Sequence, residues 1–360
     1  MTRIGVALIG LGPGSQPHLK SLVDLRHRID LRHAVCRRPA QADLGPFNGQ
    51  LAATADLDAA LADPAVQAVI VATPAGTHLD IASRCLAAGK HTLVEKPLET
   101  SLPRAQALVE CARASGLRFG VVLQHRFRPG SQRLRALLQE EALGSVQFAT
   151  VRVPWWRPQA GYYDQPGRGT RERDGGGVLL TQAIHALDLF RSLVGVSEVR
   201  AAQATTTAVH RMETEDYAAA LLRLGHGAPG LLMATTALYP GSPEVLEIAG
   251  TRGAATLAAG RLQVRWHDGR EETVEAEGPG GSGAAIMDFP HDAHRELIGD
   301  FLDAVAEGRD PFGAKPYHVP FLLHIMIHPL QKVECAVEAL QLTPCLSEGI
   351  RCQDMEREKP

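Results

Sequence analysis

The stretch RIGVALIGLGPGSQPH, residues 3–18, decides the fold of this chain. Residues 4–9 are an apolar run that predicts a buried strand, and the glycines after it predict a tight turn into a helix. Glycine lets the backbone approach a pyrophosphate closely, and a helix N-terminus presents free N–H groups and the positive end of a dipole. The spacing departs from G-x-G-x-x-G because Ser15 replaces the last glycine, but serine is small enough for the helix to pack on the sheet. The turn is therefore predicted to bind a dinucleotide through Gly10, Gly12, Pro13, Gly14 and Ser15, the alternative being a turn without ligand.

The same alternation of strand and helix continues to about residue 125. Short aliphatic runs alternate with longer segments of helical period, and these runs are IDLRHAVC (29–36), AVIVAT (68–73), HTLVEK (91–96) and RFGVVLQ (118–124). Aliphatic strands that are separated by helices indicate βαβ units and a parallel sheet covered on both faces. Residues 1–125 are therefore predicted to form a doubly wound, Rossmann-type α/β domain.

Beyond residue 125 the pattern changes. A loop-rich stretch (154–177) and one helix (about 177–194) precede successive β-like segments with Gly, Pro and Asp-Gly turns between them. Consecutive strands with few helices indicate a mostly antiparallel sheet. Residues 126–314 are therefore predicted to form an α+β domain with a large open sheet, which ends in a helix over 291–308.

The end of the chain is less regular. Residues 315–360 carry three of the six cysteines and do not resemble the helices that would be expected after such a domain. They are interpreted as a divergent tail, in which 350–360 is predicted to be disordered. The glycine-rich segment 278–285 is predicted to be a flexible loop.

Composition indicates a chain of two domains with a small partner. The 360 residues are 45% hydrophobic, which is enough for a sizeable core. Lys+Arg 37 against Asp+Glu 40 gives a net charge of −3, so charge provides no argument for nucleic acid or a membrane surface. No apolar run approaches the ~18 residues that a membrane span needs. The six scattered cysteines show no C-x-x-C spacing and fit reduced thiols in a cytoplasm.

Two arginines follow the second predicted strand. An NAD-binding fold usually places Asp or Glu there to accept a hydrogen bond from the ribose 2′-OH, whereas this chain has Arg37 and Arg38. Two guanidinium groups could hold a 2′-phosphate, so NADP is predicted as the preferred cofactor and NAD as the alternative. A solvated basic loop is the simpler interpretation of this pair.

The stretch LVEKPL, residues 93–98, ends an apolar strand with Glu95, Lys96 and Pro97. Burying charge without a partner is costly, so this ending suggests a sheet edge that opens onto a cleft where charged groups meet a ligand. The alternative is an exposed loop with a salt bridge.

Four segments together resemble the glucose–fructose oxidoreductase, inositol dehydrogenase and rhizopine catabolism family, usually called Gfo/Idh/MocA. They are GLGPGSQPH with His18, ATPAGTH (72–78), VEKP (94–97) and GGGVLLTQAIHALDL (175–189), and the resemblance covers roughly residues 1–310. It implies a dinucleotide-binding oxidoreductase of sugars, cyclitols or related polyols. It also implies a homodimer or homotetramer formed through the open sheet. On this resemblance the cofactor is expected to contact further residues, namely Thr73, Pro74, His78, Glu95, Lys96 and Gln124.

The resemblance also implies the catalytic residues. Lys96 of the E-K-P motif is expected to point at substrate and nicotinamide, and His185 is expected to transfer the proton. The residue four before this histidine is commonly Asp in the family, but here it is Thr181. On one predicted helix Thr181, His185 and Asp188 would form one stripe, so either the substrate preference differs or Asp188 supports His185. Without the resemblance, His185 would be interpreted as an ordinary helix histidine at a domain interface.

The segment 154–177 is interpreted as a substrate-side loop because aromatic faces stack on sugars and Arg and Tyr bond hydroxyls. An aromatic cluster between domains is the alternative. The candidate substrate contacts are Arg126, Trp155, Trp156, Tyr163, Arg168 and Thr181.

The chemistry predicted from these residues is hydride transfer between nicotinamide and a carbinol or carbonyl carbon. A nucleotide-sensing regulator without turnover is the second hypothesis.

No metal site is predicted. His324 and His328 have helical spacing but no evident third ligand, and Asp292 in HDAH (291–294) can serve a helix terminus.

Overall fold

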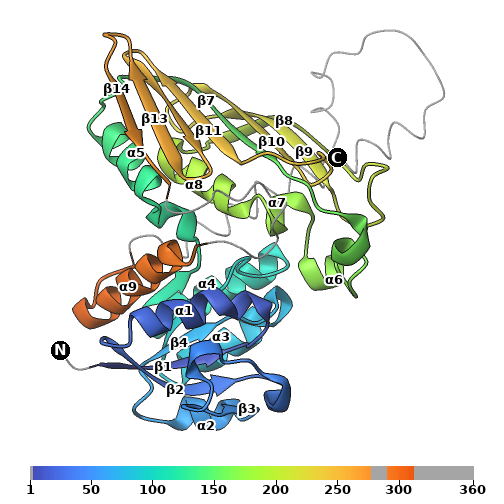
Figure 1. The fold of residues 1–360 in the computed structure, drawn as a ribbon, viewed down its shortest axis with the longest axis vertical. Coiled ribbons are helices and arrows are strands. Elements are labelled where there is room, and N and C mark those ends of the chain that lie inside the picture. The colour runs from blue at the N-terminus through green and yellow to red at the C-terminus, as the bar shows by residue number, and fades with distance from the viewer. Residues whose placement is uncertain (1–2, 277–289, 312–360) are drawn as a thin grey trace, which may run out of the picture.

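The computed structural model describes residues 3–276 and 290–311, and it contains two sheets at opposite ends of the molecule (Figure 1). The first sheet has six parallel strands in the order β3-β2-β1-β4-β5-β6. The order reverses between β1 and β4, and ligands of such sheets bind beyond the carboxyl ends of the strands at this point. The predicted Rossmann-type sheet is therefore confirmed. Its strands are β1 (Ile4–Ile9), β2 (Ile29–Val35), β3 (Ala53–Thr54), β4 (Ala68–Val71), β5 (His91–Val94) and β6 (Phe119–Val121).

Helices connect these strands and cover the sheet on both faces, as right-handed crossovers between parallel strands require. They are α1 (Gln16–Asp24), α2 (Leu57–Ala62), α3 (His78–Ala87) and α4 (Leu102–Ser115). Short 3-10 turns lie at Pro13–Ser15, Pro39–Gln41, Gly45–Phe47, Ala75–Thr77 and Gln124–Phe127.

The second sheet has eight strands in the order β14-β13-β12-β11-β7-β10-β9-β8. In the described part of the chain, β7 and β10 are its one parallel pair, so the predicted mostly antiparallel sheet is confirmed. The strands are β7 (Val146–Pro154), β8 (Glu198–Thr205), β9 (Tyr217–Arg223), β10 (Pro229–Thr235), β11 (Val245–Gly250), β12 (Gly253–Ala258), β13 (Arg261–Trp266) and β14 (Glu271–Val274).

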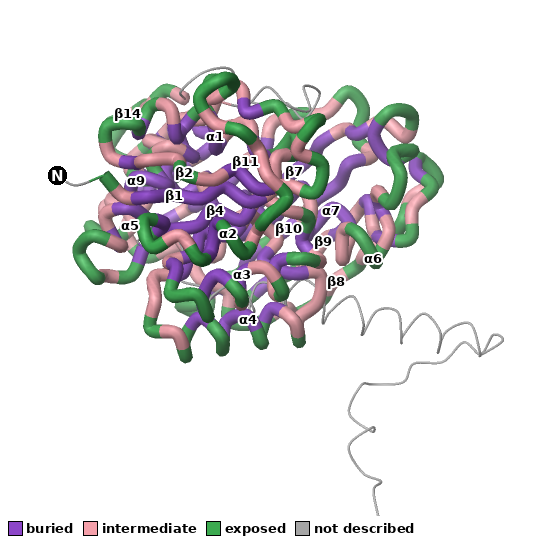
Figure 2. The backbone as a smooth tube through the Cα atoms, turned by 90° about the horizontal axis from the view of Figure 1, so that it is seen from below, coloured by how far each residue is buried: buried purple, intermediate pink, exposed green. Residues whose placement is uncertain are grey.

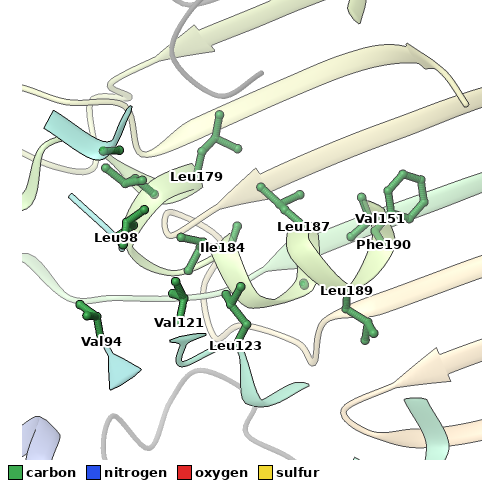
Figure 3. Packing of buried hydrophobic residues seen from close by; sticks show 14 of the residues in the cluster. Val94, Leu98, Val121, Leu123, Val151, Leu179, Ile184, Leu187, Leu189 and Phe190 are labelled. Atoms are coloured by element: carbon green, nitrogen blue, oxygen red, sulfur yellow. The ribbon is translucent and has the colours of Figure 1, made fainter. Parts of the chain in front are cut away.

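In the part of the chain that the structure describes, helices cover one face of this sheet (Figure 1). Between the sheets lie α5 (Pro129–Gln139), α7 (Val178–Thr181) and α8 (Ile184–Val194), whereas the short α6 (Arg171–Asp174) lies to one side (Figure 1). One continuous hydrophobic cluster joins both sheets, and Figure 3 shows it extending from Val94 and Val121 through Ile184 to Phe190 and Val151. Buried residues follow the central strands, while exposed residues gather at the periphery (Figure 2). The two sheets therefore share one core, which fixes the walls of any cleft between them.

The single helix predicted over about 177–194 is wrong. The chain forms two helices, α7 and α8, with a break at Gln182 and Ala183, and the segment Arg171–Thr181 is bent by 49° relative to Ile184–Val194. At the break the N–H of Ala183 bonds the carbonyl of Val178, one residue farther back than an α-helix uses. Side chains on either side of the break therefore do not form one stripe.

Gly177, the glycine directly before α7, is explained by a close contact. A side chain at Gly177 would place its Cβ 1.8 Å from the carbonyl oxygen of Glu215. The carboxylate of Glu215 accepts hydrogen bonds from the backbone N–H of Gly177 (3.0 Å) and of Leu179 (3.2 Å). The start of α7 is thereby fixed to the second sheet.

The helix predicted over 291–308 is α9 (Asp292–Glu307). It packs on α1, and its apolar residues Leu297, Ile298 and Phe301 belong to a cluster with Val6 and Leu8 of β1. The boundaries at residues 125 and 314 therefore do not follow the packing of α9. The loop 278–285, the pair His324 and His328, and the tail 315–360 lie outside the described residues.

Candidate active site between the two sheets

A cleft of about 450 Å³ lies between the two sheets, at the carboxyl ends of the parallel strands. Its walls come from both halves of the chain. The structure brings together ten of the predicted site residues there: Pro13, Gly14, Thr73, Glu95, Lys96, Gln124, Trp155, Arg168, Thr181 and His185.

The glycine turn after β1 fits a dinucleotide. Gly10 has φ +99°, and a Cβ there would meet the carbonyl of Ala72 at 2.5 Å, so only glycine allows this approach of β1 to β4. At Gly12 and Gly14, by contrast, a Cβ would meet no atom within 4 Å. The turn is held by Ser15, whose hydroxyl donates to the Gly12 carbonyl at 2.7 Å. The backbone is therefore rigid and open on the side where a pyrophosphate would approach.

Glu95 and Lys96 project from the end of β5 into the cleft. The carboxylate of Glu95 lies 2.7 Å from Nε2 of the buried His18, and it accepts a hydrogen bond from the Lys96 N–H at 2.9 Å. Burial alone would raise the pKa of Glu95. The hydrogen bond and the charge of His18, followed in size by the charge of Lys96, lower this pKa to about 2. Glu95 is therefore an anion at neutral pH.

Lys96 crosses the cleft. Its Nζ donates to the carbonyl oxygen of Thr181 at 3.2 Å, so the ammonium group touches the second half of the chain. Burial lowers the pKa of Lys96, the charge of Glu95 opposes this shift, and Arg168 and Arg157 lower it further. The ammonium is thus held where it can bind a substrate oxygen.

His185 lies on α8 and stacks on His125, with ring centroids 4.8 Å apart. Its Nδ1 is buried and has no hydrogen-bond partner among the described residues. Burial, and then the charge of Lys96, lower the pKa of His185 well below the usual histidine value. The imidazole is therefore neutral at physiological pH and able to accept a proton.

Two further histidines that are buried in the cleft wall, His125 and His294, were not predicted as site residues. His125 has a pKa far below its usual value because it is buried and lies near Arg128. Burial and His18 lower the pKa of His294 on α9 to about 3. These positions carried no local signal, since His125 lies in a short turn and His294 reaches the cleft only because α9 folds back onto the first sheet.

We expect the buried histidines to destabilise the chain at acid pH. His125, His185 and His294 have a lowered pKa, so below the unfolded value of about 6.5 the unfolded chain binds more protons than the folded chain. Stability is therefore full above about pH 6.5 and falls as the pH drops. Each of the three contributes up to about 1.4 kcal/mol per pH unit between about pH 6 and 5, before carboxylates titrate.

Urea unfolding at several pH values between 5 and 7.5 measures this loss. His294→Gln removes one titrating ring and should reduce the slope by about one third, in proportion to one proton of three. An unfolding free energy that stays constant over this range would contradict the expectation.

Asp188 and Arg126 lie elsewhere than predicted. Asp188 is 1% exposed and receives two bonds from Arg126, Nε to Oδ2 at 2.6 Å and Nη2 to Oδ1 at 2.5 Å. Neither residue lines the cleft. Because a bidentate buried pair satisfies both partners, the structure does not favour Asp188 as a support for His185 or Arg126 as a substrate contact.

Thr181 lines the cleft, but its hydroxyl bonds the Gly177 carbonyl at 2.6 Å and also the Gln182 side chain. The group that it presents to Lys96 is its backbone carbonyl. The next residue, Gln182, was not predicted and also lines the cleft.

The aromatic loop turns a different set of side chains to the cleft than predicted. Trp156 packs against His210 and Tyr239, and the hydroxyl of Tyr163 bonds Thr236 at 2.9 Å, so neither lines the cleft. A direct neighbour of each does line it, namely Arg157 after Trp156 and Tyr162 before Tyr163. The turn at Gln159–Tyr163 that carries both tyrosines is irregular, with Gly161 at φ +79°, and sequence periodicity does not reveal it.

Four predicted cofactor contacts lie around the rim or beneath it. His78 is buried, and its nitrogens contact the Thr73 carbonyl (2.8 Å) and the Pro97 carbonyl (3.0 Å), so it joins two loops of the cleft. Pro74 directly precedes the 3-10 turn Ala75–Thr77 and does not line the cleft. Arg37 and Arg38 are exposed after β2 and are not part of the cleft wall.

Within residues 3–276 and 290–311, no group of three or more His, Cys, Asp or Glu side chains is arranged to hold a metal ion. His291 instead contacts Asp24 at 2.9 Å. In the same residues no single helix is long and apolar enough to cross a membrane, and one bent helix pair, Arg171–Thr181 with Ile184–Val194, passes by length and composition only.

Comparison with protein families gives two matches that follow one another along the chain. Residues 4–123 match the oxidoreductase family with an NAD-binding Rossmann fold, and residues 131–256 match the GFO/IDH/MocA C-terminal domain. Together they span the first sheet, the second sheet from β7 to β11, and Lys96 and His185 of the cleft.

Individual relatives agree with these matches. An uncharacterised oxidoreductase of Synechocystis, sll0816, is 28% identical over 275 residues, 72% of each chain. Inositol 2-dehydrogenase of Rhizobium meliloti is 24% identical over 318 residues, 84% of this chain and 89% of that protein. The structure of levoglucosan dehydrogenase with NADH and L-sorbose superposes with a TM-score of 0.81 at 22% identity, covering 92% and 98% of the two chains, and it supports the fold.

Proposed function

Because the chain belongs to the Gfo/Idh/MocA family of NAD-binding oxidoreductases, we propose that it transfers hydride between the dinucleotide and a hydroxyl-bearing carbon of a sugar, cyclitol or related polyol. One observation carries this proposal. Lys96 and His185, from different halves of the chain, line one cleft that begins at the glycine turn. A regulator that only senses dinucleotide would have no need of a neutral histidine and an ammonium group there.

The dinucleotide would be held by residues of the first half of the chain. Its pyrophosphate fits the open turn at residues 10–15, and Thr73, Glu95 and Gln124 line the wall that continues toward Lys96. When bound, the nicotinamide ring supplies the hydride acceptor in oxidation and the donor in reduction.

The reaction then needs one group to bind the substrate oxygen and one to take its proton. In the oxidative direction the imidazole of His185 would accept the proton of the substrate hydroxyl whose carbon is oxidised. Lys96 donates to the same oxygen and stabilises the negative charge that develops there, which is worth most in a cleft that excludes water. Glu95 stays ionised beside Lys96 and favours its charged form.

Incubation of the purified chain with NAD⁺ or NADP⁺ and a panel of neutral and acidic polyols tests the proposal. Formation of reduced nicotinamide, followed at its absorbance band, supports the enzyme. Tight dinucleotide binding without turnover of any polyol or carbonyl partner in either direction would instead favour the regulator.

We further propose that NADP is preferred to NAD, since the exposed Arg37 and Arg38 follow β2 where a carboxylate for the ribose would otherwise stand. Replacing Arg37 with Asp and Arg38 with Ala should weaken NADP binding by up to a few kcal/mol, through loss of charge-assisted bonds to the 2′-phosphate. NAD binding should be nearly unchanged. Titration of both dinucleotides by calorimetry measures the two affinities, and equal losses for both would exclude this role.

One face of the second sheet is not covered by any helix of the described residues, and this face supports self-association of the chain. Phe148, Leu221 and Leu231 are 48%, 55% and 39% exposed on strands that lie side by side in this face. An exposed apolar patch on an open sheet is typical of a contact between subunits. We propose a homodimer or homotetramer through this face, and light scattering that gave a monomer mass at micromolar concentration would contradict it.

A further inference from the structure

Three basic side chains line the cleft, namely Lys96, Arg157 and Arg168. Their charges act on one another, since Arg168 and Arg157 both lower the pKa of Lys96 after the effects of burial and Glu95. Like charges near one another in a partly buried site repel, and an anion bound between Lys96 and Arg168 would offset this repulsion.

The carboxylates of the cleft wall already have partners. Glu95 lies against His18 at 2.7 Å. Glu244 pairs with Arg128 at 2.9 Å, and Asp292 on α9 pairs with Arg295 at 2.9 Å. In the described part of the chain, none of the three forms an ion pair with Arg168.

Arg168 is held in place by a phenol rather than by a carboxylate. Its guanidinium lies 4.5 Å from the ring centroid of Tyr162, and its Nη1 donates to the Tyr162 hydroxyl at 3.1 Å. The Nε of Arg168 is buried and has no hydrogen-bond partner among the described residues. A buried donor without an acceptor costs free energy, and an incoming acceptor removes that cost.

The hydroxyl of Tyr162 can also donate a hydrogen bond to a ligand. It accepts from Arg168 and from Nε2 of Gln182, the latter at 2.9 Å. A hydroxyl has two acceptor positions and one hydrogen, so its own hydrogen remains to be donated. The cleft therefore has three hydrogen-bond donors in this cluster, namely the Arg168 Nε, the Tyr162 hydroxyl and the Lys96 ammonium.

The backbone of this loop is fixed from behind. The carbonyl of Arg157 lies 2.7 Å from Nε2 of His210, whose Nδ1 lies 2.7 Å from the carboxylate of Asp216. His210 and Asp216 are fully buried in their side chains. A guanidinium on a backbone held in this way needs little reorganisation to meet a ligand.

We propose that this donor cluster, Lys96, Arg157, Tyr162 and Arg168, binds an oxyanion on the substrate, so that the preferred substrates are polyols that carry a carboxylate or a phosphate group. The inference rests on the proposed oxidoreductase function and names its substrate class. Guanidinium groups match the geometry of carboxylate and phosphate oxygens, and charge-assisted bonds in a partly buried site are stronger than those to neutral hydroxyls.

Three probes of one sugar skeleton separate the possibilities. D-glucose is neutral, D-glucuronate carries a carboxylate, and D-glucose 6-phosphate carries a phosphate. Equilibrium binding of each to the full chain with saturating NAD⁺ or NADP⁺, measured by calorimetry, and turnover under the same conditions give two independent readouts. We expect at least one of the two anions to bind about 10- to 100-fold more tightly than glucose, the range of charge-assisted bonds.

Variants of Arg168 locate the effect. Arg168→Met should remove most of the preference for the anion over glucose, while Arg168→Lys should keep part of it. Tyr162→Phe removes one donor without changing charge and should weaken the anion by a smaller factor. Arg211→Met is the matched control, because Arg211 lies near the same loop with its side chain 83% exposed and outside the cleft, and it should leave all three affinities unchanged.

The outcomes separate the substrate class from the enzyme. Anion binding that Arg168→Met abolishes supports the inference, even if no probe turns over and the oxidoreductase proposal fails. The inference would be overturned if glucose bound and turned over as well as both anions, or if Arg168→Met left the preference for the anion intact. Neither result would contradict the proposed oxidoreductase function.

Discussion

His185→Ala is expected to lower kcat by roughly 10²–10⁴-fold and to leave the dinucleotide affinity within about tenfold, the loss that is typical of a missing general base. The imidazole lines the cleft on α8, while the phosphates of the dinucleotide would bind the glycine turn after β1. Its lowered pKa keeps it neutral, so at physiological pH it is already in the form that accepts a proton. Removing it therefore affects the chemical step and not the anchoring of the cofactor.

The measurement is steady-state turnover together with dinucleotide binding on the same preparation. His294→Ala is the matched control, since it also removes a buried imidazole of the same cleft but from α9. Equal loss in both variants would mean that packing and not proton transfer is being measured. Wild-type turnover in His185→Ala would make this histidine structural and the proposed mechanism wrong.

The first sheet could be predicted from the sequence because its signals are local. The run from Ile4 to Ile9 and the glycines after it show both the strand and the turn, and the structure adds only that Gly10 is required by the approach of Ala72. The end of β5 is also local, since Glu95 and Lys96 follow directly on a buried strand. Residues of this kind reach the cleft through backbone topology alone.

The position of Asp188 and the start of α7 could not be predicted, because they depend on contacts that sequence spacing does not encode. Asp188 has the spacing of a residue that could support His185, but a bidentate bond from Arg126, 62 positions earlier, holds it elsewhere. Gly177, the glycine directly before α7, is explained by Glu215, 38 positions later. Interactions over such distances along the chain appear only when both elements are placed in three dimensions.

The substrate loop shows the same limit at the scale of one residue. Trp155 lines the cleft and Trp156 does not, and Tyr162 lines it while Tyr163 packs inward. Composition alone identifies the loop as aromatic and basic, but it does not show which side chain faces the cleft, and the irregular turn at Gln159–Tyr163 has no regular period. Two of the donors that the further inference uses, Arg157 and Tyr162, were therefore not among the predicted residues, whereas Lys96 and Arg168 were.

Lys96→Met combined with His185→Ala is expected to lower kcat by much less than the product of the two single losses. Each single variant should lose roughly 10²–10⁴-fold, because one removes electrostatic stabilisation of the substrate oxygen and the other removes the base that takes its proton. Both act on the same O–H bond, and residues that act on one atom fail as a unit. Methionine keeps most of the volume of lysine, so the walls of the cleft stay in place.

A double-mutant cycle on kcat for the best substrate measures this coupling. Groups in contact through a shared partner show interaction free energies of about 0.5–3 kcal/mol, whereas distant and independent sites add within about 0.5 kcal/mol. The control is the same cycle with Lys20→Met in place of Lys96→Met. Lys20 is an exposed lysine at the rim of the same cleft, so the effects of Lys20→Met and His185→Ala on kcat should add. Additive losses for Lys96 and His185 would mean that the two groups do not act on one oxygen, even if each is essential. Because Lys96 already reaches the carbonyl of Thr181 across the cleft, four residues before His185, the structure favours coupling.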